Sequence, residues 1–163
     1  FSDASSSTLV SKCKKKYFGK FNFGTDGSGS KHLYAKNSKT CNDKSDLYMN
    51  GSSIYSFTQS KIPNHIKKNL INNRISINSI DKFIFHQASK LVLDSLSKSL
   101  KVEEKLVLSN LKNLGNTISS SIPFLLKYAD QNKSIINGSK LSMCGFGVGL
   151  SWGSCVYEWK CLK

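Results

Sequence analysis

One short apolar run that ends at a histidine constrains the fold of this chain more than any other feature. Phe83, Ile84 and Phe85 are followed directly by His86, and a run of this length and composition is typical of a short buried strand. Apolar residues then recur at the spacing of one helix face, namely Val92, Leu93, Leu96 and Leu100. Because strands also alternate with helices elsewhere in the chain, we expect a layered α/β fold.

Periodicity and turn residues predict the remaining elements. We expect, in chain order, strands near 17–23 and 32–35 around a turn at 24–30, an exposed loop at 37–48, helices at 54–70, 102–114 and 117–128, and strands at 140–144 and 150–159 joined by a glycine-rich turn. Pro63 is expected to interrupt the first of these helices or to mark where it begins. Gly115 is suited to ending the second, and Pro123 is compatible with the third if it lies in the first turn. The serines at 119–121 would suit the close approach of a neighbouring segment.

The length and composition of the chain indicate one folded domain over residues 1–163. Of its 163 residues, 39% are hydrophobic and 10% are aromatic, which is enough for a core of its own. No apolar run approaches the roughly 18 residues of a membrane-spanning helix, so we expect no membrane partner. The chain starts with Phe1 rather than Met, and Phe1-Ser2-Asp3 is typical of the interior of a fold. We therefore expect further sequence upstream, or the removal of a segment by processing.

The charge of the chain is strongly positive. The net charge is +14, which indicates an anionic partner such as nucleic acid, an acidic carrier protein or the phosphates of coenzyme A. However, Arg74 is the only arginine, and bidentate recognition of bases and phosphates favours arginine over lysine. A bias toward Lys, Asn, Ile and Ser also follows from an AT-rich coding sequence, and we favour that origin for most of the charge.

The cysteines indicate neither a disulfide framework nor a zinc site. They are odd in number and include no Cys-x-x-Cys pair, and they lie at Cys13, Cys41, Cys144, Cys155 and Cys161. We therefore expect reduced thiols inside a cell and no metal. Cys144 and Cys155 lie in strand-like apolar runs, so we expect both to be buried and unreactive.

Three features could carry chemistry, and each also has a purely structural interpretation. His86 lies between a strand end and a helix start, where sites collect in open α/β folds, but a histidine there is also a common structural hydrogen-bonding group. Asn116 follows a glycine at a predicted helix start, where Asn is a good N-cap. The glycine-rich segment 145–153 is compatible with a tight hairpin whose glycines adopt positive φ. A phosphate-binding loop is disfavoured because this segment joins two strands instead of opening a helix.

Taken together, these features resemble the β-ketoacyl-acyl-carrier-protein synthase III family of thiolase-like condensing enzymes. The resemblance is carried, in chain order, by Phe1-Ser2-Asp3-Ala4, Met49-Asn50-Gly51 with Ile54-Tyr55, Ser79-Ile80-Asp81-Lys82-Phe83 leading to Phe85-His86-Gln87-Ala88, Gly115-Asn116-Thr117 with Ser121-Ile122-Pro123, and the glycine-rich segment 145–153. It implies a thiolase-like fold in which this chain is the C-terminal half of an α-β-α-β-α layered sandwich. It also implies a homodimer and, as a partner, the N-terminal half of the same enzyme.

The resemblance also implies a reaction. In this family an acyl group rests on a cysteine as a thioester, malonyl-acyl carrier protein loses carbon dioxide, and the resulting carbanion attacks that thioester to start a fatty-acid or related acyl chain. His86 and Asn116 would donate hydrogen bonds to the malonyl thioester carbonyl as it becomes an enolate. The backbone N–H of Val148 would form an oxyanion hole, and Phe146 would gate the site beside the cysteine. The implied substrates are a coenzyme A thioester and malonyl-acyl carrier protein, with no cofactor.

Several positions that bind substrate in the family differ in this chain. Gln87 and Ser89 are expected to bind substrate, although the family usually has Asn where Ser89 stands. An arginine that is typical of the family is replaced by Leu91 beside Lys90, and a frequent lysine is replaced by Ser56. These departures leave open whether the donor is a coenzyme A or a carrier-protein thioester.

The remaining expectations concern the whole protein. None of the five cysteines lies in a small-residue run like the one that carries the family's nucleophile, so we expect this chain alone to be inactive. We expect a cytoplasmic protein, or a plastid protein if a transit peptide preceded it. An alternative of a different class is a non-catalytic basic module for nucleic acid or an acidic protein. Against nucleic acid, Phe83, Phe85 and Trp152 lie in apolar runs rather than among the lysines, where bases could stack on them.

Overall fold

The computed structural model of the chain describes residues 1–35 and 47–160. Its strands and main helices are, in chain order, β1 (Asn22–Thr25), β2 (Leu33–Ala35), β3 (Leu47–Met49), α1 (Gly51–Asn72), β4 (Lys82–Phe85), α2 (Lys90–Leu100), α3 (Leu111–Leu114), α4 (Ser121–Gln131), β5 (Lys140–Gly147) and β6 (Ser151–Glu158). Short 3-10 helices lie at Gly27–His32, Ile77–Ser79, Glu104–Leu106 and Ile118–Ser120. Strands and helices thus alternate as expected.

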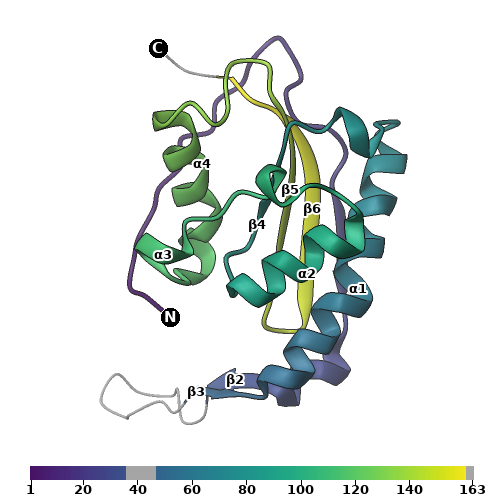
Figure 1. The fold of residues 1–163 in the computed structure, drawn as a ribbon, viewed down its shortest axis with the longest axis vertical. Helices are drawn as coiled ribbons and strands as arrows, with labels where there is room; N and C mark the ends of the chain where they lie inside the picture. Colours follow the sequence, from purple (N-terminus) through teal and green to yellow (C-terminus); the bar gives the residue numbers. More distant parts are fainter. Residues whose placement is uncertain (36–46, 161–163) are drawn as a thin grey trace.

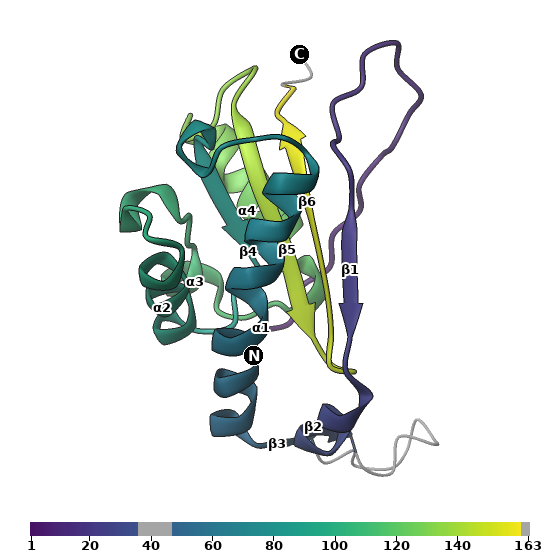
Figure 2. The same cartoon turned by 90° about the vertical axis from the view of Figure 1, so that its right-hand side faces the viewer.

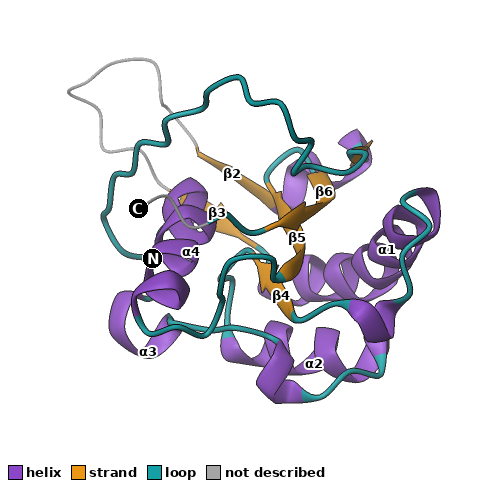
Figure 3. Ribbon diagram, turned by 90° about the horizontal axis from the view of Figure 1, so that it is seen from above, coloured by secondary structure: helices purple, strands orange, loops and turns teal. Residues whose placement is uncertain are grey.

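A four-stranded mixed sheet forms the centre of the fold. Its strand order is β1-β6-β5-β4, with β4 parallel to β5 and the other neighbours antiparallel, while β2 and β3 pair separately. Helices α1 and α2 cover one face of this sheet and α4 covers the other (Figures 1 and 3). Figure 2 shows α1 running along the sheet, with β1 at the far edge. The architecture is therefore a layered α/β arrangement, which confirms the sequence-based prediction.

Strand β4 is buried on both faces because its side chains alternate between two cores. Phe83 and Phe85 belong to the cluster beneath α1 and α2, and Ile84 belongs to the cluster beneath α4. All three side chains are fully buried. This double burial explains why the three residues after Lys82 are all large and apolar and why the strand could be predicted from the sequence.

Helix α1 is continuous through Pro63, so the expectation that this proline interrupts or begins the helix was wrong. A proline inside a helix costs about 3 kcal/mol because one hydrogen bond is lost and the ring crowds the preceding turn. Ile62 and Ile66 on either side of it are completely buried, and packing of this face outweighs local propensity. The helix begins instead after Asn50, whose Oδ1 accepts a hydrogen bond from the backbone N–H of Ser53 at 3.1 Å.

The predicted helix at 102–114 was also wrong. Only Leu111–Leu114 is α-helical, whereas Val107 forms a parallel bridge with Phe83. The backbone N–H of Leu108 donates to the Phe83 carbonyl at 3.0 Å. The free edge of β4 therefore binds this segment as an extended chain, an interaction that helical periodicity cannot reveal.

Other boundaries differ from the sequence-based expectation by a few residues. The first strand lies at 22–25 instead of 17–23, a 3-10 helix replaces part of the predicted turn at 24–30, and residues 47–48 of the predicted loop belong to β3. Residues 37–46 of that loop lie outside the described residues. Strand β5 runs three residues further than expected, to Gly147, whereas β6 spans 151–158 instead of 150–159, so the glycine-rich turn shortens to 148–150. Pro123 does lie in the first turn of α4, as predicted.

A buried amide ties α1 to the two strands at the sheet edge. Asn69 is 1% exposed, and its Nδ2 donates to the Lys20 carbonyl at 2.9 Å, to Asn22 Oδ1 at 3.2 Å and to the Ser154 carbonyl at 3.3 Å. Replacing it by leucine leaves the buried Ser154 carbonyl and two partly buried acceptors without that donor, so we expect Asn69→Leu to lower the free energy of unfolding by about 2–3 kcal/mol. Urea unfolding would measure this loss. The exposed neighbour Asn72, replaced in the same way, is the control, and equal losses in both variants would contradict the prediction.

Candidate active site

The candidate site lies at the carboxyl end of β4 and the neighbouring end of β5. His86 follows β4 directly, and its backbone N–H donates to the Cys144 carbonyl of β5 at 2.9 Å, so the sheet register continues through the histidine. The His86 and Phe146 rings meet edge to face, with centroids 5.4 Å apart and an interplanar angle of 88°. Parallel pairing of β4 with β5 therefore brings together two of the residues that the sequence singled out.

Asn116 joins this pair through the backbone of Ile118. Its Oδ1 accepts a hydrogen bond from the Ile118 backbone N–H at 2.9 Å, and the backbone of Ile118 also lies near enough to the His86 ring to affect the pKa of the imidazole. The two polar side chains are thus held against the same residue. Sequence reasoning missed the role of Ile118, because its backbone makes both contacts and its side chain carries no signal for them.

The backbone of Ile118 is in an unfavourable conformation. Its φ is 53°, which places a β-branched residue in the left-handed region. Such a conformation costs about 1–3 kcal/mol and persists where surrounding contacts impose it. The side chain is nevertheless 59% exposed, so core packing does not impose it. The contacts to Asn116 and His86, together with the bond from Ser121 Oγ to the Ile118 carbonyl at 2.7 Å, hold this turn.

The contact to Ile118 also orients the amide of Asn116. An oxygen that accepts a backbone N–H leaves the amide nitrogen as the free donor. Within residues 1–35 and 47–160, Nδ2 of Asn116 makes no hydrogen bond. The Asn116 side chain thus caps the Ile118 N–H from one residue before the N-cap position, which Thr117 occupies, and its amide nitrogen remains available as a donor.

Burial makes His86 harder to protonate. The pKa of the imidazole lies below its ordinary value of 6.5, chiefly because burial penalises the charged ring, while the hydrogen bond with the Ile118 backbone acts in the opposite direction. The ring is therefore neutral at pH 7. A neutral ring can interact with a developing negative charge without placing a full positive charge in the site.

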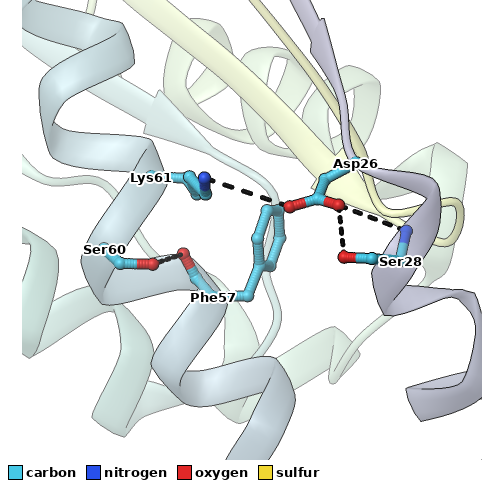
Figure 4. Close-up of polar contacts among 5 residues, drawn as sticks. All are labelled: Asp26, Ser28, Phe57, Ser60 and Lys61. Carbon is cyan, nitrogen blue, oxygen red and sulfur yellow. Dashed lines mark hydrogen bonds and ion pairs between the residues drawn. The ribbon is translucent and has the colours of Figure 1, made fainter.

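The turn that carries Val148 is anchored by Asp26. The backbone N–H of Asp26 donates to the Leu150 carbonyl at 2.8 Å, and the Leu150 N–H donates back at 3.0 Å. Figure 4 shows how the Asp26 carboxylate accepts bonds from the Ser28 N–H and Oγ and lies 3.9 Å from the Lys61 ammonium of α1. The bonds from Ser28 and, to a lesser extent, the charge of Lys61 lower the pKa of Asp26. The Val148 side chain is 63% exposed at the tip of this turn.

The two residues expected to bind substrate lie in different environments. Gln87 is 3% exposed, and its amide is bonded to backbone groups of the protein itself. The expectation that it contacts substrate is therefore corrected, because its polar atoms are already used inside the fold. Ser89 is exposed and caps α2, its Oγ accepting a bond from the Val92 N–H at 3.3 Å. A contact between Ser89 and substrate stays a prediction.

The two buried cysteines, Cys144 and Cys155, are not candidates for a reactive nucleophile. Cys144 and Cys155 are buried, as predicted. Burial raises the pKa of Cys155 to about 11, and it raises the pKa of Cys144 even further. Cys13 is exposed, whereas Cys41 and Cys161 lie outside the described residues.

The described part of the chain offers neither a metal-binding cluster of side chains nor a helix able to cross a membrane. Among residues 1–35 and 47–160, no group of three or more His, Cys, Asp or Glu side chains is placed to hold a metal ion. None of the helices in these ranges combines the length and the hydropathy that a membrane crossing needs.

Some aromatic side chains do lie among the lysines, contrary to the expectation from the sequence. Phe83 and Phe85 are buried as expected, but three other aromatic residues, Phe18, Phe21 and Phe23, are exposed beside the lysine-rich segment 12–20. These rings stack on one another, with centroids 5.7 Å apart for Phe18–Phe21 and 6.1 Å for Phe21–Phe23. This row of aromatic side chains lies on β1 and the segment before it, among the lysines, where the sequence had suggested none.

Comparison with known proteins decides between a condensing enzyme and a basic binding module. Residues 70–159, a range that contains His86, Asn116 and Val148, match the family described as 3-oxoacyl-[acyl-carrier-protein (ACP)] synthase III C terminal. The chain belongs to this family. The predicted resemblance and the thiolase-like fold of a C-terminal half are confirmed, and the basic binding module is not favoured.

Relatives and a solved structure agree with this assignment to the synthase III family. The chain is 36% identical to the β-ketoacyl-[acyl-carrier-protein] synthase III of Trichodesmium erythraeum over 113 residues, which cover 69% of this chain and 34% of that protein. It is 30% identical to the chloroplastic enzyme of Arabidopsis thaliana over 181 residues, covering 98% and 45%. The crystal structure of the Thermus thermophilus synthase III superimposes with a TM-score of 0.84 at 29% identity, covering 93% of this chain and 49% of that one. The chain therefore spans about a third to a half of the length of these relatives.

Proposed function

We propose that this chain supplies His86, Asn116 and an oxyanion turn to an acyltransferase that condenses an acyl thioester with malonyl-acyl carrier protein. The observation that carries the proposal is the meeting of His86 and Asn116 at the backbone of Ile118 in a member of the synthase III family. Residues 1–163 act as one half-domain in this proposal. The reaction starts a fatty-acid or related acyl chain.

The chemistry follows from where negative charge develops. When the bond between the malonyl methylene carbon and its carboxylate breaks, carbon dioxide leaves and the electron pair moves toward the thioester carbonyl, giving an enolate. Donors from the neutral His86 ring and from Asn116 Nδ2 stabilise that oxygen. The enolate carbon then attacks the acyl thioester, a new carbon–carbon bond forms, and the thiolate leaves. The Val148 backbone N–H stabilises the oxygen of this second step, beside the ring of Phe146.

The proposed partners include a second polypeptide segment. We propose that this chain packs on the N-terminal half of the enzyme, which carries the cysteine nucleophile, and that the whole protein is a homodimer. The exposed aromatic residues Phe18, Phe21 and Phe23 support packing against another protein surface of the enzyme, because a contiguous apolar surface is typical of an interface. An acyl carrier protein and a coenzyme A thioester are the proposed substrates, with Ser89 near the thioester arm and no organic cofactor or metal. The proposed location is the cytoplasm or, as for the chloroplastic relative, a plastid.

A hybrid enzyme tests this proposal. In it, the chain replaces the matching half of the Thermus thermophilus relative, and size-exclusion chromatography reports whether the product is a folded dimer. We expect the hybrid to form a β-ketoacyl product from an acyl-coenzyme A and malonyl-acyl carrier protein, whereas the chain alone forms none. The unaltered Thermus enzyme is the positive control. A folded hybrid dimer that releases no carbon dioxide from malonyl-acyl carrier protein would contradict the proposal.

A further inference from the structure

Gln87 follows His86 directly, yet its side chain bonds to a segment more than twenty positions later. Its Nε2 donates to the Phe85 carbonyl at 2.9 Å and to the Leu108 carbonyl at 3.4 Å, and its Oε1 accepts from the Asn110 backbone N–H at 3.0 Å. A side-chain amide offers the same donor and acceptor as a peptide group. In this fold the amide of Gln87 thus acts as an additional peptide unit between two backbone segments.

The place of this amide is set by the edge of β4. Phe83 is bridged to Val107, and its carbonyl accepts the Leu108 N–H at 3.0 Å. Backbone groups of alternate strand residues point to the same side, so the Phe85 carbonyl faces the same segment. At that point the two backbones separate, and Gln87 supplies the donor that the backbone no longer provides. The side chain therefore extends the pairing of β4 with segment 107–110 by one step, up to the position of His86.

The far end of this contact leads directly to the other candidate catalytic residue. The Asn110 carbonyl accepts the Leu114 N–H at 3.0 Å, which closes the single turn of α3, and the Gly115 N–H donates to the Leu111 carbonyl at 2.9 Å. Asn116 is the next residue. Because one hydrogen-bonded turn separates Asn110 from Asn116, a shift of Asn110 shifts Asn116 and Ile118 with it.

We propose that Gln87 is a positioning residue that sets the separation between His86 and Asn116. It ties the backbone of the histidine to the segment from which the asparagine departs, and the contacts at Ile118 then hold the two side chains. This inference deepens the proposed function and rests on it for what His86 and Asn116 do. The closeness of the His86 ring to the Ile118 backbone, which this role predicts, can be measured without an activity assay.

The variant that removes the amide is Gln87→Met, which keeps the length of the side chain. It leaves the Asn110 N–H and the Phe85 and Leu108 carbonyls buried without this partner, which is unfavourable. These groups regain partners if segment 107–110 moves toward water, and that movement takes Ile118 away from His86. Asn69→Leu is the matched control, because Asn69 is similarly buried and its Nδ2 lies within hydrogen-bond distance of three acceptors but contacts no part of this segment.

The first measurement is an NMR cross-peak between the His86 ring protons and the Ile118 backbone, recorded on the full chain. We expect it in the unaltered protein and in Asn69→Leu, and we expect its loss in Gln87→Met, although both variants lower the urea midpoint. A cross-peak that persists in folded Gln87→Met would overturn the proposal. Gln87→Asn serves if Gln87→Met does not fold, because this amide is one methylene too short to reach Asn110. Loss of the cross-peak in Gln87→Asn supports the proposal, and its retention overturns the proposal.

The second measurement separates this inference from the proposed function. In the hybrid enzyme, we expect Gln87→Met to lower kcat about 100-fold with little change in KM, since a displacement of about 1 Å has effects of this size. Asn69→Leu, assayed below its unfolding temperature, should retain kcat. If the unaltered hybrid is inactive, the proposed function fails, and the cross-peak still decides the role of Gln87. If the hybrid is active and Gln87→Met retains kcat, the positioning role fails alone.

Discussion

Replacing His86 by alanine is expected to lower kcat of the hybrid enzyme about 10²- to 10³-fold, because one donor to the developing enolate is lost. The His86 ring lies edge to face with Phe146 and near the backbone of Ile118, so its position is held before substrate arrives. The donor acts on charge that appears only in the transition state. KM for malonyl-acyl carrier protein should therefore change much less than kcat. Release of carbon dioxide and formation of the β-ketoacyl product measure both steps.

His65 offers a closely matched control for this substitution. Its ring is also partly buried, meets Trp152 edge to face at 6.2 Å and 88°, and has a pKa lowered chiefly by burial. It lies on α1, away from the end of β4. We expect His65→Ala to keep kcat within a few-fold of the unaltered hybrid. Equal losses in the two variants would mean that His86 acts through stability alone.

The pH dependence of the reaction tests the charge of the His86 ring. Because the pKa of the folded ring lies below 6.5, the ring is neutral at pH 7 and gains a proton only as the pH falls below this value. A charged ring would stabilise the malonyl carboxylate and oppose its loss. We therefore expect the rate to fall on the acid side with a midpoint below pH 6.5, and a midpoint above 6.5 would contradict a neutral donor. The stability contributed by the neutral ring is lost in the same direction, because the unfolded chain takes up the proton first.

Sequence alone predicted well the elements whose burial shows as a local pattern of apolar residues. Apart from Ser97, the buried positions of strand β4 and helix α2 are apolar, and their periodicity shows this directly. The secondary-structure predictions failed where a contact with a distant segment outweighs the conformational preference of the local sequence. Val107 and Leu108 lie in a helical pattern but pair with β4, and Pro63 lies within a helix that packing holds together.

In the candidate site, too, some residues could be identified from the sequence and others only from the structure. His86 and Asn116 were identified as a pair by their resemblance to a family, because nothing in the spacing of two residues thirty positions apart predicts that they meet. The left-handed backbone of Ile118 was not predictable, since the sequence at that position favours an extended or helical conformation. Gln87, a polar residue beside a candidate catalytic histidine, was expected to face substrate. Only its bonds to Leu108 and Asn110 show that it faces the protein instead.

Asn116→Asp separates the two interpretations of Asn116 that the sequence left open. Aspartate is as good an N-cap as asparagine, and its Oδ1 can accept the Ile118 N–H in the same way. If capping were the whole role of Asn116, the variant would keep both stability and kcat. If Nδ2 donates to the enolate, the variant loses that donor and places a negative charge where another develops.

For the donor role we expect Asn116→Asp to lower kcat of the hybrid at least 10³-fold. Loss of one such donor accounts for about 10²- to 10³-fold, and repulsion between the carboxylate and the enolate adds to it. Urea unfolding should give a midpoint close to that of the unaltered protein, since the contact to Ile118 is retained. Asn78→Asp is the control: Asn78 is exposed in the 3-10 helix Ile77–Ser79, away from this segment, so it should change kcat little. A stable Asn116→Asp variant with normal kcat would leave Asn116 as a cap, and the donor role would then fall to His86 alone.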